Sequence, residues 1–205
     1  MRYALALLFP LICAVVRVEA QAAPMVAQPY QRALTREARA LWGLNAPVAA
    51  MGAEIEQESG WNPDARSAYA GGLAQFTPQT AAWISGAYRK ELGENQPFNP
   101  QWAIRALVRY DFDLRRQVAP AASDCDHWGF TLSAYNGGAG NLAKDRAICR
   151  ANDCDPTRWF GEVERFTSRA PAAAKENRAY PRRILLKLQS NYADWGNPVS
   201  CKPGV

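Results

Sequence analysis

The sequence predicts a predominantly α-helical single domain with one small irregular or hairpin lobe. Apolar residues recur at helical spacing in several segments, and β-branched alternation is nearly absent. Prolines and glycines stand where helices would begin and end. A chain of 205 residues that is 48% hydrophobic and 21% charged suits one domain with a hydrophobic core, not a disordered segment.

Cap residues and prolines mark three of the predicted helices. Asn99 caps one that runs toward Pro120, and Thr77 caps another. A third is expected to begin with Pro181 in its first turn and to carry an apolar stripe as far as Tyr192. These three segments supply much of the predicted helical content.

Glycines separate the remaining predicted elements. A helix over residues 47–59 ends at Gly60, and short helices over residues 127–136 and 139–149 lie on either side of a Gly-Gly pair. Between Asn62 and Phe76, glycines and polar residues predict a hairpin or irregular lobe instead, without strands that can be assigned.

The N-terminal region differs in composition from the rest of the chain. Residues 1–20 combine a basic start, an apolar run and the small-residue sequence VEA, the pattern of a secretory signal peptide. An uncleaved N-terminal anchor is the alternative. We expect an N-terminal extension at 21–39, loose over its first ten residues, a domain at 40–194 and a C-terminal tail at 195–205.

Export constrains the partners that the chain would meet. A formal net charge of +5 is mildly basic, which favours an anionic partner such as a cell-wall polymer or a membrane surface. A periplasmic or secreted protein would not meet nucleic acid, and the basic residues form no dense block. We therefore expect no nucleic-acid partner.

Four cysteines follow the predicted signal peptide. An even number in an exported chain predicts two disulfides, and three pairings are possible. If Cys149 pairs with Cys154, then Cys125 is left for Cys201. A zinc site made of these cysteines and His127 is the alternative, although their spacing matches no zinc pattern.

Glu58 is the candidate catalytic residue. It is predicted in the last turn of its helix, where the helix dipole disfavours a carboxylate, and Glu54 lies one turn earlier on the same face. Trp61 would add an apolar wall, and each of these features raises the pKa of Glu58. A carboxyl that stays protonated near neutral pH can donate a proton to a glycosidic oxygen. A solvated surface acid is the alternative.

Three further stretches carry amide and phenol side chains. GGLAQFTP contains Gln75 and Phe76, SAYNGG contains Tyr135 and Asn136, and Tyr180 comes just before the last predicted helix. Amides and phenols bond sugar hydroxyl and acetamido groups, while aromatic faces cover sugar rings. Each stretch taken alone is equally compatible with packing in a core.

In this order, the motifs resemble those of the soluble, lysozyme-like lytic transglycosylases, which cleave bacterial peptidoglycan. Residues 58–63 resemble the family's Glu-Ser pair, aromatic and Asn-Pro, and Ser67 follows the glutamate by nine positions. Residues 72–75 resemble its Gly-Leu-Met-Gln run, residues 134–138 its Ala-Tyr-Asn-Ala-Gly run, and Tyr180 its late tyrosine. The resemblance covers roughly residues 40–194, the predicted domain.

The resemblance implies a lysozyme-like (α+β) fold, no cofactor and no metal. It implies cleavage of the β-1,4 bond between N-acetylmuramic acid and N-acetylglucosamine, with formation of 1,6-anhydromuramic ends. Glu58 would be the single catalytic acid and base. The implied substrate-binding residues are Ser59, Ser67, Gln75, Phe76, Tyr135, Asn136 and Tyr180.

Three positions depart from the family pattern. Ala74 replaces the usual methionine, Gly137 replaces an alanine, and Asp64 stands where asparagine is commoner. Only Asp64 bears on the mechanism. If Asp64 activated a water, the enzyme would be a hydrolytic muramidase, whereas a loop acid of this kind also commonly bonds nearby backbone amides. A non-catalytic wall-binding or assembly protein is a third possibility. The family's habits suggest a monomer that opens the wall for a secretion, conjugation or phage-like apparatus.

Overall fold

The computed structural model describes residues 22–201, so the predicted signal peptide at 1–20 and the end of the predicted tail lie outside the described residues. The described part contains eight α-helices, three 3-10 helices and no strand, which confirms the predominantly helical class. The α-helices are α1 (Gln31–Trp42), α2 (Val48–Ser59), α3 (Pro78–Ala87), α4 (Arg89–Leu92), α5 (Pro100–Gln117), α6 (Asp124–Gly137), α7 (Ala139–Ala151) and α8 (Pro171–Leu186). The 3-10 helices are η1 (Met25–Tyr30), η2 (Val163–Arg165) and η3 (Leu188–Tyr192).

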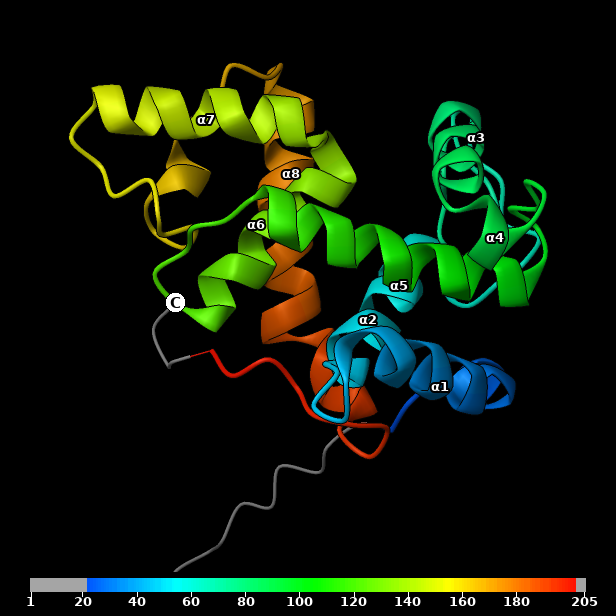
Figure 1. Ribbon diagram of the computed structural model, residues 1–205. Coiled ribbons are helices and arrows are strands. Elements are labelled where there is room, and N and C mark those ends of the chain that lie inside the picture. The colour runs from blue at the N-terminus through cyan, green and yellow to red at the C-terminus, as the bar shows by residue number, and fades with distance from the viewer. Residues whose placement is uncertain (1–21, 202–205) are drawn as a thin grey trace, which may run out of the picture.

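The helices pack around α2, α6 and α8. Helix α2 packs against η3 and α8, while α6 packs against α5, α7 and α8. In Figure 1, α5 runs between the part that carries α3 and α4 and the part that carries α7 and α8. None of the helices within residues 22–201 has the length and apolar character needed to cross a membrane.

The predicted helix boundaries at three cap positions are confirmed. The Asn99 side chain accepts hydrogen bonds from the N–H groups of Gln101 and Trp102 at 3.0 and 3.2 Å. Thr77 Oγ1 accepts one from the N–H of Thr80 at 3.1 Å. Gly60 ends α2 in the left-handed conformation (φ 59°, ψ 29°), which a glycine adopts without steric cost.

The predicted lobe between α2 and α3 is irregular. Isolated bridges pair Arg66 with Gly71 and Gly71 with Phe76, and no strand forms in this part of the described chain. Gly72 has a φ of 78°, and a Cβ there would lie 1.9 Å from the Pro97 carbonyl oxygen. The lobe therefore closes against the loop before α5 only because Gly72 has no side chain.

The predicted start of the last helix at Pro181 is wrong. Helix α8 begins at Pro171 and continues through Pro181, and η3 follows after a break at Lys187. A proline inside a helix removes one N–H donor and crowds the carbonyl four residues earlier, but the preceding Ala-rich turns favour a helix. As a consequence, Tyr180 projects from the middle of a helix instead of a loop.

The N-terminal extension was predicted to be loose over residues 21–30, and this is wrong for the described part of it. Residues 25–30 form η1, and Ala23 and Ala27 are buried in the core. Helix α1 follows at once and packs against α2 and α5. These segments belong to the folded body.

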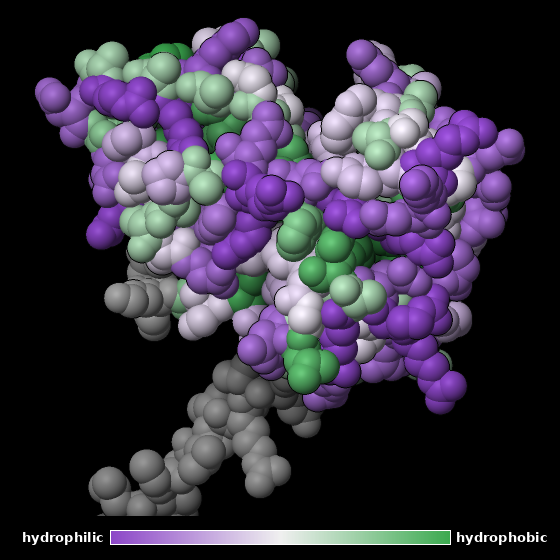
Figure 2. Space-filling model, in the orientation of Figure 1, coloured by the Kyte–Doolittle hydropathy of each residue, from purple (hydrophilic) through white to green (hydrophobic). Residues whose placement is uncertain are grey.

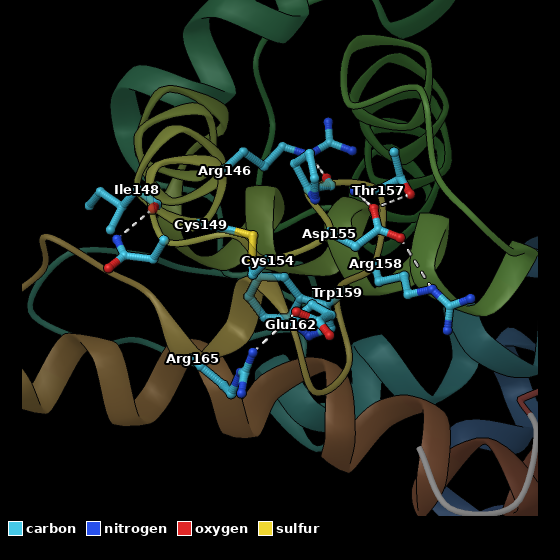
Figure 3. Close-up of a disulfide and its surroundings, with 12 residues drawn as sticks. Arg146, Ile148, Cys149, Cys154, Asp155, Thr157, Arg158, Trp159, Glu162 and Arg165 are labelled. Atoms are coloured by element: carbon cyan, nitrogen blue, oxygen red, sulfur yellow. Dashed lines mark hydrogen bonds and ion pairs between the residues drawn. A yellow bond between two sulfur atoms is a disulfide. The ribbon is translucent and has the colours of Figure 1, made fainter.

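Two disulfides join the four cysteines. Cys149 pairs with Cys154 across the turn after α7, as Figure 3 shows, and Cys125 at the start of α6 pairs with Cys201. The disulfide prediction is confirmed, with the pairing that closes the short loop. His127 instead contacts the Arg115 carbonyl at 2.6 Å, so neither the histidine nor the cysteines are arranged for zinc.

Candidate active site

A cleft of about 450 Å³ lies at the C-terminal end of α2. Figure 2 shows the surface hollowed between the part of the molecule that carries α3 and the part that carries α7 and α8. The lining side chains come from α2, the irregular lobe, α3, α5, α6 and α8. They are Gln57, Glu58, Ser67, Tyr69, Ala70, Gln75, Phe76, Thr77, Thr80, Tyr110, Tyr135, Asn136, Glu176 and Tyr180.

Glu58 lies in the last turn of α2 and faces this cleft. Its Oε1 accepts a hydrogen bond from the hydroxyl of Tyr180. Burial raises the pKa of Glu58 to about 7, the Tyr180 hydrogen bond opposes this rise, and the nearby charge of Glu176 adds to it. A carboxyl with this pKa holds its proton in part of the molecules at neutral pH and can both give and take a proton.

The prediction that Trp61 forms an apolar wall beside Glu58 is wrong. Trp61 turns away into the core, where its ring stacks on Tyr30 at 5.7 Å and its Nε1–H donates to the Tyr192 hydroxyl at 2.6 Å. Trp61 takes a positive φ of 65° directly after Gly60, and this turn directs it away from the cleft. The rings beside Glu58 in the cleft are those of Tyr135 and Tyr180.

An aromatic group forms the floor of the cleft. The rings of Phe76, Tyr110 and Tyr135 lie 5.4 to 5.9 Å apart between centroids. The Tyr135 hydroxyl donates to the Ala74 carbonyl at 2.7 Å, which links α6 to the lobe. Phe76 is therefore at once part of the core and part of the cleft wall.

The amide side chains of the predicted site are held by hydrogen bonds. Asn136 donates to Glu176 Oε1 at 3.2 Å and accepts from the Asn177 side chain at 2.9 Å. The Gln75 side chain donates to the carbonyls of Ala65 and Gly72 at 3.2 and 2.9 Å. Both amides are thus positioned before any ligand binds.

The two predicted serines lie in different places. Ser67 lines the cleft, and its Oγ accepts from the N–H groups of Tyr69 and Ala70 at 3.2 and 2.9 Å. Ser59 Oγ instead donates back to the Ile55 carbonyl at 3.2 Å, and Ser59 is not among the lining residues. The cleft thus contains seven of the eight residues that the motifs suggested.

Asp64 lies outside the cleft lining. It is exposed on the lobe, and its own N–H donates to the Asn62 side chain at 3.0 Å. The second acid in the cleft is Glu176, on α8.

Seven of the lining residues were not predicted as site residues from the sequence, and three of these seven contribute rings or a carboxyl group to the cleft. Tyr69 is 81% exposed at the mouth of the cleft, Tyr110 contributes to the floor, and Glu176 lies opposite Glu58 on α8. Glu176 precedes Tyr180 by four positions, so the two share a helix face. A helix start placed at Pro171 would have revealed this pair.

Comparisons with known proteins match the chain to a family model and to relatives of known name. A family model described as the transglycosylase SLT domain matches residues 35–155. Membrane-bound lytic murein transglycosylase F of Ectopseudomonas mendocina is 29% identical over 153 residues, which are 74% of this chain and 27% of that protein. The protein of the same name from Aeromonas hydrophila is 31% identical over 105 residues, 50% of this chain and 19% of that protein.

The fold is also similar to a solved structure. The 70 kDa soluble lytic transglycosylase SLT70 from Escherichia coli matches with a TM-score of 0.57 and 22% identity, over 82% of this chain and 25% of that one. This likeness supports the lysozyme-like fold. The chain thus matches only about a quarter of the length of its first relatives. Because the family model covers more than half of its residues, the chain belongs to the transglycosylase SLT domain family.

Proposed function

We propose that this protein is a lytic transglycosylase that cleaves the β-1,4 bond between N-acetylmuramic acid and N-acetylglucosamine in peptidoglycan. The single observation that carries the proposal is the position of Glu58, a proton-holding carboxyl in a polar cleft, hydrogen-bonded to Tyr180. Membership of the family and the names of the relatives support the same activity.

In the first step, the protonated Glu58 gives its proton to the glycosidic oxygen, and the bond from that oxygen to the anomeric carbon of muramic acid breaks. In the second step, the Glu58 carboxylate takes the proton of the C6 hydroxyl on the same sugar. The C6 oxygen attacks the anomeric carbon and closes a 1,6-anhydro ring. Glu58 ends the cycle protonated, and no water is consumed.

A single catalytic carboxylate is sufficient in this scheme because the nucleophile belongs to the substrate. An intramolecular hydroxyl has a high effective concentration, whereas ordinary glycosidases use two carboxylates. The location of Asp64 outside the cleft lining argues against the hydrolytic alternative. Glu176 hydrogen-bonds to Asn136, which suits a role in holding the site together.

The remaining cleft residues would bind the glycan strand. Ser67, Gln75 and Asn136 present polar groups, while Phe76, Tyr135 and the exposed Tyr69 present rings. Export to the periplasm would bring the protein to this substrate, and the two disulfides support an oxidising compartment. Monomeric action and service to a secretion, conjugation or phage-like apparatus stay predictions.

The test is digestion of purified peptidoglycan followed by mass analysis of the released muropeptides. We expect products lighter by one water than hydrolytic products, which identifies anhydro ends. Glu58→Gln should reduce cleavage by about 10²- to 10⁴-fold, the usual contribution of a general acid, while the circular dichroism spectrum stays unchanged. The matched control is Asp64→Asn, which should cleave like the wild type.

Reducing ends in the wild-type digest would contradict the transglycosylase reaction and indicate hydrolysis. Full activity of Glu58→Gln would contradict the catalytic assignment. Loss of activity in Asp64→Asn, with the fold retained, would return Asp64 to the mechanism.

A further inference from the structure

Three carboxyl groups cluster at the base of the cleft, and the proposed reaction uses only one of them. Glu54 lies one turn before Glu58 on α2. Asp111, in the middle of α5, raises the pKa of Glu54, and the charge of Glu58 in turn raises the pKa of Asp111. Glu58 opens to the cleft, whereas Glu54 and Asp111 are both 0% exposed. A buried carboxyl needs a partner or a proton, because an isolated buried charge is very costly.

Glu54 and Asp111 are partners for each other. A side-chain hydrogen bond between them contributes to the pKa shift of each. No N–H or hydroxyl donor within residues 22–201 bonds to Glu54 Oε2 or to either oxygen of Asp111. Two carboxylates cannot form a hydrogen bond, so one of the pair holds a proton. Glu54 is the donor, since this bond raises the pKa of Glu54 and lowers that of Asp111.

The other groups near the cluster are tyrosines and a further acid. Within the described part of the chain, no lysine or arginine is among the groups that shift the pKa of any of the three carboxyls. The Tyr180 hydroxyl bonds to Glu58 Oε1 and lies 3.4 Å from Glu54 Oε1. The other groups that face the cluster are Tyr110 on α5, Tyr135 on α6 and Glu176 on α8.

We propose that Asp111 is a positioning residue for Glu58. Asp111 and Glu54 form a buried acid pair that shares one proton. As pH rises, the three carboxyl groups lose their protons one at a time. The inference rests on the proposed function, because it assigns a role in the acid chemistry of Glu58. The charge of Glu58 raises the pKa of Asp111, and such coupling is reciprocal. An ionised Asp111 would therefore disfavour ionisation of Glu58 and retain Glu58 as the proton donor.

The titration ranges of the groups agree with this role. Burial raises the pKa of Asp111 to about 7, within the same range as Glu58, and the charge of Glu58 contributes to that rise. Burial first, and then Asp111, holds the pKa of Glu54 well above its usual value. Glu54 therefore keeps its proton while Asp111 and Glu58 compete.

The first experiment measures the pH profile of kcat/KM for peptidoglycan cleavage by Asp111→Asn. We expect its basic limb to move to lower pH by about 1 unit, the size of coupling typical of interacting carboxyls. The matched control is Asp113→Asn on the same helix, whose carboxyl bonds to Tyr88 on the other side of α5 and whose loss should leave the profile in place. Glu54→Gln should move the limb less than Asp111→Asn, because its amide still donates to Asp111.

Two outcomes of this experiment would overturn the proposal. One is an unmoved basic limb in a folded Asp111→Asn protein, which would leave Asp111 with a structural role only. The other is a larger shift in Glu54→Gln than in Asp111→Asn, which would place the charge on Glu54.

A second experiment separates the inference from the proposed function. Carboxyl carbon-13 NMR follows the titration of Asp111 in the wild type and in Glu58→Gln. Coupling is reciprocal, so we expect Asp111 to titrate at lower pH once Glu58 cannot ionise. An unchanged Asp111 titration overturns the proposal, whatever the protein does to peptidoglycan. A shift in a protein that fails to cleave peptidoglycan supports the acid cluster and contradicts only the proposed reaction.

Discussion

The hydroxyl of Tyr180 has one proton and two nearby carboxyl acceptors. It donates to Glu58 Oε1 and lies 3.4 Å from Glu54 Oε1. Burial and the charge of Glu58 raise the pKa of Tyr180 well above its usual range, so the phenol stays a donor at every working pH. Its bond favours the carboxylate form of Glu58 and limits the effect of burial on that group.

Removal of this hydroxyl should shift the titration of Glu58. In Tyr180→Phe the carboxylate loses its donor, so we expect the pKa of Glu58 to rise and the basic limb of kcat/KM to move to higher pH. The control is Tyr192→Phe, which removes a buried hydroxyl bonded to Glu56 and Trp61 and should change stability without moving the profile. A shift to lower pH in Tyr180→Phe would contradict this assignment.

At the scale of single residues, the sequence predicted which residues belong to the site better than it predicted how their neighbours are oriented. Motif order identified Glu58, Gln75, Asn136 and other residues that the fold brings to one cleft. The orientation of Trp61 was not predictable from the sequence. Trp61 has a positive φ, as does Gly60 before it, and this backbone conformation sets the direction of its side chain. Which way a chain turns after a helix is set by the core that it meets, and here that core includes distant rings such as Trp195.

Among the elements, those with a polar cap were the most predictable. The side chains of Asn99 and Thr77 each accept a hydrogen bond from a backbone N–H group. The two helices begin directly after these cap residues, as predicted. Proline alone is ambiguous, since it favours the first turn but is tolerated within a helix that tertiary packing supports. In α8 both occur, with Pro171 at the start and Pro181 inside.

The cap of α5 offers a test at the element scale, because this helix carries Asp111. Asn99→Ala removes the acceptor for two N–H groups, and we expect a loss of about 1 kcal/mol in the free energy of unfolding. Gln101→Ala, in the same turn and exposed, should change it by less than about 0.5 kcal/mol. Urea denaturation followed by circular dichroism measures both, and equal losses would contradict a capping role.

At the scale of the whole molecule, the site depends on segments far apart in the sequence. The lobe, α5, α6 and α8 each contribute to the cleft around one end of α2. Motif order predicted that the lobe, α6 and α8 meet the end of α2. It predicted neither the contribution of α5 to the cleft nor the buried acid pair, because Tyr110 and Asp111 belong to no motif. The burial of Asp111 follows from the face that α5 turns toward the core. Buried acids of this kind make global stability depend on pH.

Glu58 should make the protein less stable as pH rises. Its pKa in the folded state, about 7, lies above the ordinary value of 4.5, so the folded protein binds more protons than the unfolded chain between these values. The stabilising contribution is fully present below about pH 4.5 and is lost as pH rises through about 7. Glu58→Gln cannot ionise, so the variant does not lose this stability as pH rises. We therefore expect the variant to gain stability over the wild type progressively from pH 5 to pH 8, by on the order of 2 kcal/mol at the upper end.

Urea denaturation at a series of pH values measures this difference, with Asp64→Asn as the control because its carboxyl is exposed on the lobe. A difference between Glu58→Gln and the wild type that stays constant with pH would mean that Glu58 titrates alike in the folded and unfolded chains. That result would remove the physical basis for a protonated Glu58 at neutral pH. A growing difference would show that the proposed catalytic acid lowers stability when it ionises. The burial that retains the proton of Glu58 also disfavours the negative charge that forms when this proton leaves.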